Sequence, residues 1–186
     1  SLAQIAHIIR HQDPRKQRFQ LSSCGRWVRA TQGHSTGAVD PQQMYEGPLT
    51  EHELPTYMVH ATYPAYLASI AEHGLWPGGS FWAAWGARSN GKAGGPKGRP
   101  STRDMIHAVG WPEGRPMQCP PAELTQGLRY DAYAAVVILT GPTLALRNRW
   151  YRTRNGQYVT PDPIPEYCMT LFKNIRTGER YIFRDT

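Results

Sequence analysis

The sequence has few cysteines, no long apolar run and no visible signal peptide. Its three cysteines, Cys24, Cys119 and Cys168, are widely spaced and form no C-x-x-C pair. This argues against a disulfide framework and against a zinc site, and it favours a reducing, intracellular compartment such as cytoplasm or nucleus. Each cysteine is better explained as a small residue, buried or neutral, than as a nucleophile. No stretch approaches the roughly 18–20 apolar residues of a membrane span.

The common nucleotide-binding motifs are also missing. No G-x-G-x-x-G follows a strand and no G-x-x-x-x-G-K-[ST] occurs, which excludes Rossmann and P-loop interpretations. The carboxylates of Glu123, Asp131 and Asp162 are scattered, so acid–base catalysis by a carboxylate pair is not indicated. His60 and His107 have no third Cys, His or carboxylate at the spacing of a zinc site, and we therefore expect no metal.

Positive charge is what the chain does have. It carries a formal net charge of +7 over 186 residues, and its 21 basic residues comprise 17 Arg and 4 Lys. An excess of positive charge favours polyanionic partners, and the preference for Arg suits bidentate binding of phosphate. Many basic proteins bind no nucleic acid, so charge alone leaves the question open.

Apolar spacing predicts two helices and a series of short strands. We expect helices over 2–12, ended by Pro14, and over 65–73, with Pro64 at the first position and Gly74 after the last turn. The predicted strands cover 18–21, a return strand from Trp27, 57–62, 105–109, 132–139, 150–152, 158–160, 168–171 and 181–183. Turns are predicted at Ser22–Gly25, Asn155-Gly156 and Thr177-Gly178, and one or two helical turns at 143–147. This mixture indicates an α+β domain.

Residues 77–101 differ from the rest of the chain. They include seven glycines, three prolines, four basic residues and no acidic residue. The composition predicts a loop. It is either a basic lid over a phosphate-bearing substrate or a disordered insertion, and the sequence leaves both open.

Residues 29–35 are the most informative stretch. They follow a strand-like run, so their polar groups would emerge together at a strand end, where binding groups commonly lie. The planar guanidinium of Arg29 suits a phosphate, with further polar groups beside it. Those further groups are Gln32, His34 and Ser35.

Two histidines occupy similar places on apolar strands, His60 before Ala61 and Thr62, and His107 before another alanine. A buried imidazole has to be hydrogen-bonded, so each could be a satisfied core residue. The small residues beside them would also let a ligand approach. Arg129 precedes the most apolar strand and could point into the same cleft as Arg29.

The heptapeptide at 29–35 resembles the R-A-N-Q-G-H-S signature of the RNA 2′-phosphotransferase family. Other segments resemble family motifs in the same order: Arg15–Phe19 (K-Q-R-F), Val59–Thr62 (V-H-G-T), Arg103–Ala108 (R-x-H-I-H-x-A), Gly127–Arg129 (G-M-R), and Trp150–Gly156 with Ile164–Tyr167 (F-Y-R-S-x-N-G … I-P-P-x-Y). The likeness covers most of the chain.

The resemblance implies an ADP-ribosyltransferase-like split β-sandwich that holds NAD⁺ as a co-substrate in a central cleft. In this family the 2′-phosphate of a tRNA-like RNA attacks the nicotinamide-bearing ribose carbon and expels nicotinamide. The new ribose hydroxyl then attacks the phosphate, leaving a 2′-hydroxyl on the RNA and ADP-ribose cyclic phosphate. By resemblance, Arg29 and Arg129 are catalytic and Arg103 contacts phosphate or RNA. NAD⁺ would be bound by His60, Ala61, Thr62 and His107.

Some residues depart from the family pattern. Thr31 replaces Asn, and Ala61 replaces a Gly whose backbone approaches NAD⁺. The family's Arg-His pair lies in an N-terminal lobe, and Arg10-His11 is too close to Arg15 to match it. We therefore expect residues 1–14 to be the remnant of that lobe or a joining helix in a longer protein, and 15–186 to form the NAD-binding domain.

Those departures leave three functions open. The first is removal of an RNA 2′-phosphate. The second is transfer of ADP-ribose to a terminal phosphate of RNA or DNA, without the second step. The third is an inactive RNA-binding module that uses its basic face and the tryptophans of the 77–101 loop.

Overall fold

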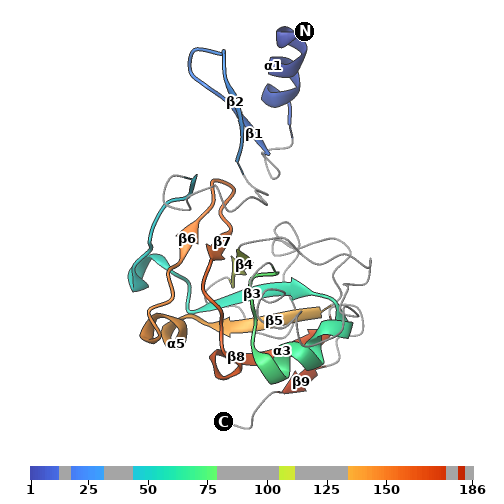
Figure 1. Ribbon diagram of the computed structural model, residues 1–186, viewed down its shortest axis with the longest axis vertical. Helices are drawn as coiled ribbons and strands as arrows, with labels where there is room; N and C mark the ends of the chain where they lie inside the picture. The colour runs from blue at the N-terminus through green and yellow to red at the C-terminus, as the bar shows by residue number, and fades with distance from the viewer. Residues whose placement is uncertain (13–17, 32–43, 79–104, 112–133, 175–179, 183–186) are drawn as a thin grey trace, which may run out of the picture.

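The computed structural model describes residues 1–12, 18–31, 44–78, 105–111, 134–174 and 180–182 (Figure 1). Predictions for 13–17, 32–43, 79–104, 112–133, 175–179 and 183–186 lie outside these residues. They include nearly all of the 77–101 loop and the Thr177-Gly178 turn. Within the described part the protein is α+β, with antiparallel sheets and few helices, as the sequence predicts.

A seven-stranded antiparallel sheet forms the main body. Its strands, in spatial order, are β6 (Tyr151–Arg152), β7 (Tyr158–Thr160), β4 (Ile106–Gly110), β3 (Tyr57–Thr62), β5 (Ala134–Leu139), β8 (Met169–Asn174) and β9 (Arg180–Ile182). The predicted strand at 57–62 is confirmed at both ends. Strand β5 lies between β3 and β8, and its first five residues are all buried, which confirms the prediction from its continuous apolar run.

The larger hydrophobic core lies against one face of this sheet. It joins sheet residues such as Met58 and Val136 to Trp150, which is fully buried. Helix α3 (Leu67–His73) contributes Ile70 to this core, and α5 (Thr140–Ala145) adds the partly buried Leu144. A smaller cluster, which includes Val59 and Val137, lies on the opposite face by strand alternation.

The helix that ends before Gly74 could be predicted from the local sequence pattern alone. A 3₁₀ turn, η3 (Pro64–Tyr66), precedes α3, and Gly74 caps that helix with φ of 79°, as expected. A Cβ on Gly74 would lie 2.5 Å from the Ile164 carbonyl oxygen, so the close approach also requires glycine. The described residues also include two more 3₁₀ turns, η2 (Glu51–Glu53) and η5 (Glu166–Cys168).

Helix α5 begins three residues before the predicted start at 143. Thr140 fixes this start, because its N–H donates to the Thr56 carbonyl and its hydroxyl to the Pro55 carbonyl. Because Gly141 and Pro142 are poor helix formers, the helix propensities of the sequence predicted a start at 143, which is too late. The contacts with residues 55 and 56 come from far away in the sequence.

Residues 1–12 and 18–31, here called the N-terminal unit, form a separate structure at one end of the molecule (Figure 1). Helix α1 (Leu2–Arg10) has a capping box at Ser1 and Gln4, and it ends before the predicted boundary at residue 12. Strands β1 (Phe19–Leu21) and β2 (Val28–Ala30) pair as the predicted hairpin. In the described part, no helix is long and apolar enough to cross a membrane.

Candidate active site

The β1–β2 hairpin positions Arg29. The Gly25 N–H donates to the Ser22 carbonyl (2.9 Å), and Gly25 takes a φ of 71°, which closes the turn. Ser22 also accepts from the Trp27 N–H through its side-chain oxygen (3.1 Å). The turn residues predicted from the sequence therefore fix the strand that carries Arg29.

Gln12 attaches helix α1 to this hairpin. Its Nε2 donates to the carbonyls of Ile9 (2.9 Å) and Phe19 (2.7 Å), while its Oε1 accepts from the Arg18 N–H (2.9 Å). Gln12 could not be predicted from the sequence, because no local pattern marks a side chain whose partners lie on two elements. One amide thus satisfies backbone groups at the end of α1 and the start of β1.

Arg29 is exposed, and its Nε donates to Gln20 Oε1 across the hairpin (3.0 Å). This bond uses the Nε–H of the guanidinium and holds the Arg29 side chain on the hairpin surface. Thr31, which follows the strand, is buried. The hairpin and the sheet carrying His60 are separate in Figure 1. The predicted companions Gln32, His34, Ser35, Arg103 and Arg129 lie outside the described residues, so their convergence with Arg29 stays a prediction.

The second group of predicted site residues lies where β4 leaves β3. Strand β3 pairs with β5 along all six residues, but it pairs with β4 only through Met58–Gly110 and Val59–Val109. Beyond that point β4 pairs with β7, His107 lying opposite Val159. The ladder between β3 and β4 therefore ends just before His60.

The His60 imidazole spans this gap. Its Nδ1 lies 2.7 Å from the His107 carbonyl oxygen. A carbonyl oxygen only accepts, so Nδ1 carries the hydrogen, and in the neutral ring Nε2 holds the lone pair. The structure thus brings the two predicted residues together through one ring and one backbone carbonyl.

The environment of these residues is intermediate between core and surface. His60, Ala61 and His107 are half-buried, whereas Thr62 is buried at 7 % exposure. Because Val59 pairs with Val109, alternation places His60 and His107 on opposite faces of the sheet. Neither imidazole is sealed in the core. Their roles toward NAD⁺ stay predictions.

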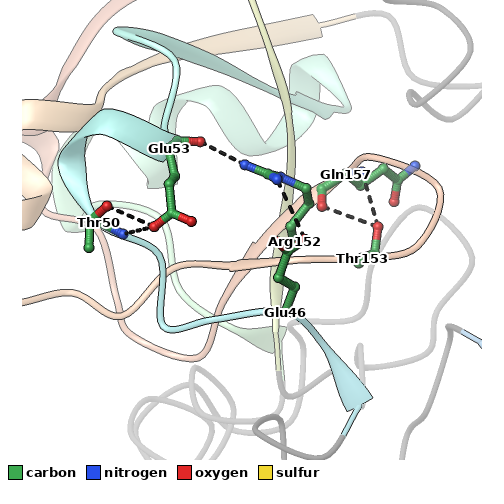
Figure 2. Close-up of polar contacts among 6 residues, drawn as sticks. All are labelled: Glu46, Thr50, Glu53, Arg152, Thr153 and Gln157. Atoms are coloured by element: carbon green, nitrogen blue, oxygen red, sulfur yellow. Dashed lines mark hydrogen bonds and ion pairs between the residues drawn. The ribbon is translucent and has the colours of Figure 1, made fainter.

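Arg152 anchors the neighbouring edge of the sheet (Figure 2). Its Nη2 donates to the Glu53 carbonyl (2.9 Å), and its Nη1 lies 3.5 Å from a carboxylate oxygen of Glu46. Hydrogen bonds from the backbone N–H and then the hydroxyl of Thr50 lower the pKa of Glu53, with smaller help from the charge of Arg152. Arg152 therefore holds β6 to the 46–53 segment.

The turn that follows confirms another prediction. Thr153 Oγ1 accepts from the Gln157 N–H (3.0 Å), and Gly156 takes a φ of 77° between them (Figure 2). The Asn155-Gly156 turn thus joins β6 to β7 as expected. Since β7 pairs with the His107 segment of β4, this hairpin helps to position the His107 carbonyl.

The described residues offer no group of three or more His, Cys, Asp or Glu side chains that could hold a metal ion. The chemistry that they present is instead an exposed guanidinium on the hairpin and an imidazole held at the point where two strands diverge.

Comparison with known proteins links these features. A model of the "RNA 2′-phosphotransferase, Tpt1 / KptA family" matches residues 1–162. Three curated relatives are each named "Probable RNA 2′-phosphotransferase". They come from Pseudomonas syringae pv. tomato (42 % identical over 60 residues), Pseudomonas paraeruginosa (40 % over 76) and Rhodopirellula baltica (43 % over 60).

These pairwise matches are partial. They cover 32 %, 41 % and 32 % of this chain, and 29 %, 37 % and 29 % of the respective relatives. The matched part is thus about a third of each relative's length, whereas the family model spans most of this chain. The chain belongs to the RNA 2′-phosphotransferase (Tpt1 / KptA) family.

Proposed function

We propose that this chain is an NAD⁺-dependent RNA 2′-phosphotransferase with an ADP-ribosyltransferase-like split β-sandwich. The match of the family model over residues 1–162 is the observation that carries the proposal. The short β3–β4 ladder, which ends before His60, supports it independently. In this proposal the co-substrate lies where strands β3 and β4 diverge.

The residues at the divergence fit a nicotinamide ribose. The bond from His60 Nδ1 to the His107 carbonyl fixes the orientation of the imidazole. We assign this ring to contacts with the nicotinamide ribose. Thr62 follows two positions later on the same strand face, and the single methyl of Ala61 narrows the site only slightly.

The phosphate is assigned to arginines. In this proposal Arg29 and Arg129 bind the RNA 2′-phosphate, with Gln32, His34, Ser35 and Arg103 contacting the phosphate or the RNA beside it. NAD⁺ supplies an activated ribose carbon with nicotinamide as its leaving group. Because the phosphate is already anionic, the residues need to neutralise and orient it rather than deprotonate it. This is consistent with the scattered carboxylates of the sequence.

The direct test is to incubate the protein with labelled NAD⁺ and an RNA carrying one internal 2′-phosphate. We expect release of ADP-ribose cyclic phosphate and an RNA with a free 2′-hydroxyl. A stable ADP-ribosylated terminal phosphate would instead support the alternative transfer reaction. RNA binding without NAD⁺ binding in calorimetry would leave the inactive RNA-binding module.

Arg29→Ala tests the assignment of the phosphate ligand. We expect single-turnover phosphate removal to fall by about 100-fold or more, the scale of losing one positioned group that stabilises developing charge. The free energy of unfolding should change by no more than about 0.5 kcal/mol, since the side chain is exposed.

Arg26→Ala is the matched control, because it removes the same charge from the same exposed hairpin. It should retain most of the activity. Equal losses in the two variants would show that the hairpin acts only through its overall charge. An unfolded Arg29→Ala protein would show that Arg29 is structural.

A further inference from the structure

Trp27 is an unusual residue for a hairpin surface, because 75 % of it is exposed. Among the described residues, Trp27 forms hydrogen bonds only through its backbone. Its N–H donates to Ser22 Oγ (3.1 Å), and its carbonyl accepts from the Ser22 N–H (2.8 Å). The backbone is thus fixed on both sides while the indole faces outward. Nothing in the fold of the hairpin requires so large an aromatic ring there.

The pairing places Trp27 beside Arg29. Gln20 lies opposite Arg29, and the Ser22–Trp27 backbone bond extends the same ladder by one pair. Residues two apart on extended backbone share a face, so Trp27, which directly precedes β2, and Arg29 project from the same side of the hairpin, about 6.8 Å apart along the chain. The bond to Gln20 holds the guanidinium on that side (3.0 Å).

Charge identifies the kind of partner. Residues 1–31 contain six Lys or Arg and a single acidic residue, Asp13. An aromatic ring beside a cation on a positive surface is the arrangement that binds single-stranded nucleic acid, the ring stacking on a base and the cation pairing with phosphate. An acidic protein would also match the charge, but single-stranded RNA presents a ring that can stack beside every phosphate, which suits an indole next to a guanidinium.

We propose that Trp27 and Arg29 form a base-stacking site for single-stranded RNA. The indole stacks on one base, and Arg29 contacts the phosphate next to it. The inference rests on the proposed function, since it takes Arg29 as a phosphate ligand and adds recognition of a neighbouring nucleotide. The site would bind single-stranded RNA of any sequence, because every base has a face that can stack on the indole.

The test measures binding of a fluorescent single-stranded oligoribonucleotide without 2′-phosphate and without NAD⁺, by anisotropy at several salt concentrations. Trp27→Ala should weaken binding about 5- to 150-fold, the range found when one stacking aromatic is removed. Trp27→Phe should retain most of the affinity. The salt dependence should be unchanged in Trp27→Ala, whereas Arg29→Ala should reduce its slope by about 0.7.

Two controls separate stacking from charge and from folding. Val28→Ala changes the adjacent exposed residue on the opposite face and should leave RNA affinity within about twofold of the native protein. Inorganic polyphosphate has charge but no bases, so Trp27→Ala should bind it as the native protein does while Arg29→Ala binds it more weakly. Thermal unfolding confirms that each variant is folded.

Unchanged RNA affinity in Trp27→Ala would overturn the inference, as would an equal loss of polyphosphate binding. Self-association that disappears in Trp27→Ala, with RNA affinity retained, would assign the indole to a second copy of the chain. The two proposals fail separately. An active Trp27→Ala enzyme with normal RNA affinity overturns only the stacking site, whereas Trp27-dependent RNA binding without phosphate removal overturns only the enzymatic activity.

Discussion

The seven-stranded sheet and the N-terminal unit are built in different ways. The sheet packs its side chains into two buried clusters, one of which includes the fully buried Trp150. In the N-terminal unit only Thr31 is buried among the described residues, and α1 buries none. Hydrogen bonds such as those of Gln12 hold that unit together. Stability therefore resides mainly in the sheet, while the N-terminal unit is free to present side chains to a partner.

The strongest test of this contrast compares two tryptophans. Trp150→Ala should lower the free energy of unfolding by about 3–5 kcal/mol, because it opens a cavity in the core and removes the hydrogen bond from the indole to Thr143. Trp27→Ala should change it by no more than about 0.5 kcal/mol. Urea denaturation followed by circular dichroism measures both. Similar losses would show that the N-terminal unit supports the global fold.

The reactivity of Cys24 and Cys168 is a second test of the difference between the N-terminal unit and the sheet. A hydrogen bond with the Ser22 side chain lowers the pKa of the exposed Cys24 thiol, whereas burial, with a smaller contribution from Glu166, raises the pKa of Cys168 to about 11. The thiolate is the reactive form, so iodoacetamide at pH 8 should modify Cys24 on the order of 100-fold faster than Cys168.

Peptide mass spectrometry reads the two sites separately, and denatured protein serves as the control in which the rates converge. Comparable rates in the native state would mean that the sheet opens readily or that Cys24 is covered.

The smallest effect concerns pH and the Arg149–Asp162 pair. Burial is the largest influence on Asp162 and raises its pKa, but hydrogen bonds from the Arg149 side chain and backbone, with its charge, leave the pKa below its usual value. A lowered pKa in the folded state stabilises the protein above the unfolded value of about 3.9, and that stability is lost as pH falls through the folded pKa.

Asp162→Asn should therefore reduce the loss of stability between pH 5 and 3, by at most about 1 kcal/mol since the Arg149 side chain is 55 % exposed. The pH dependence of the urea midpoint measures this. A steeper acid dependence in Asp162→Asn would contradict the assignment. Glu53→Gln is the control, because it removes a second carboxylate of lowered pKa at another place.

Local pattern was enough to predict most elements. The continuous apolar run gave β5, and Gly25 and Asn155-Gly156 gave two hairpins, because strand burial and turn geometry depend on neighbours in sequence. The start of α5 was wrong because Thr140 is held by Pro55 and Thr56. Such anchoring arises only in the folded chain.

For the candidate site too, some residues could be predicted from the sequence, whereas the contacts between them could not. Motif order pointed to Arg29, His60 and His107, which family membership makes natural candidates. No sequence pattern could show that β4 leaves β3 after two pairs, or that the His60 ring reaches the His107 carbonyl, since their partners are 47 residues apart. Gln12 and the outward indole of Trp27 were missed for the same reason.

The bond between His60 and the His107 carbonyl has one more consequence. Two backbone pairs alone would let β4 slip along β3, and a slip by one residue would turn Val109 out of its cluster. An imidazole that reaches one particular carbonyl penalises every such slip, because the carbonyl would move out of its reach. The ring that we assign to the co-substrate thus also fixes the alignment of the two strands.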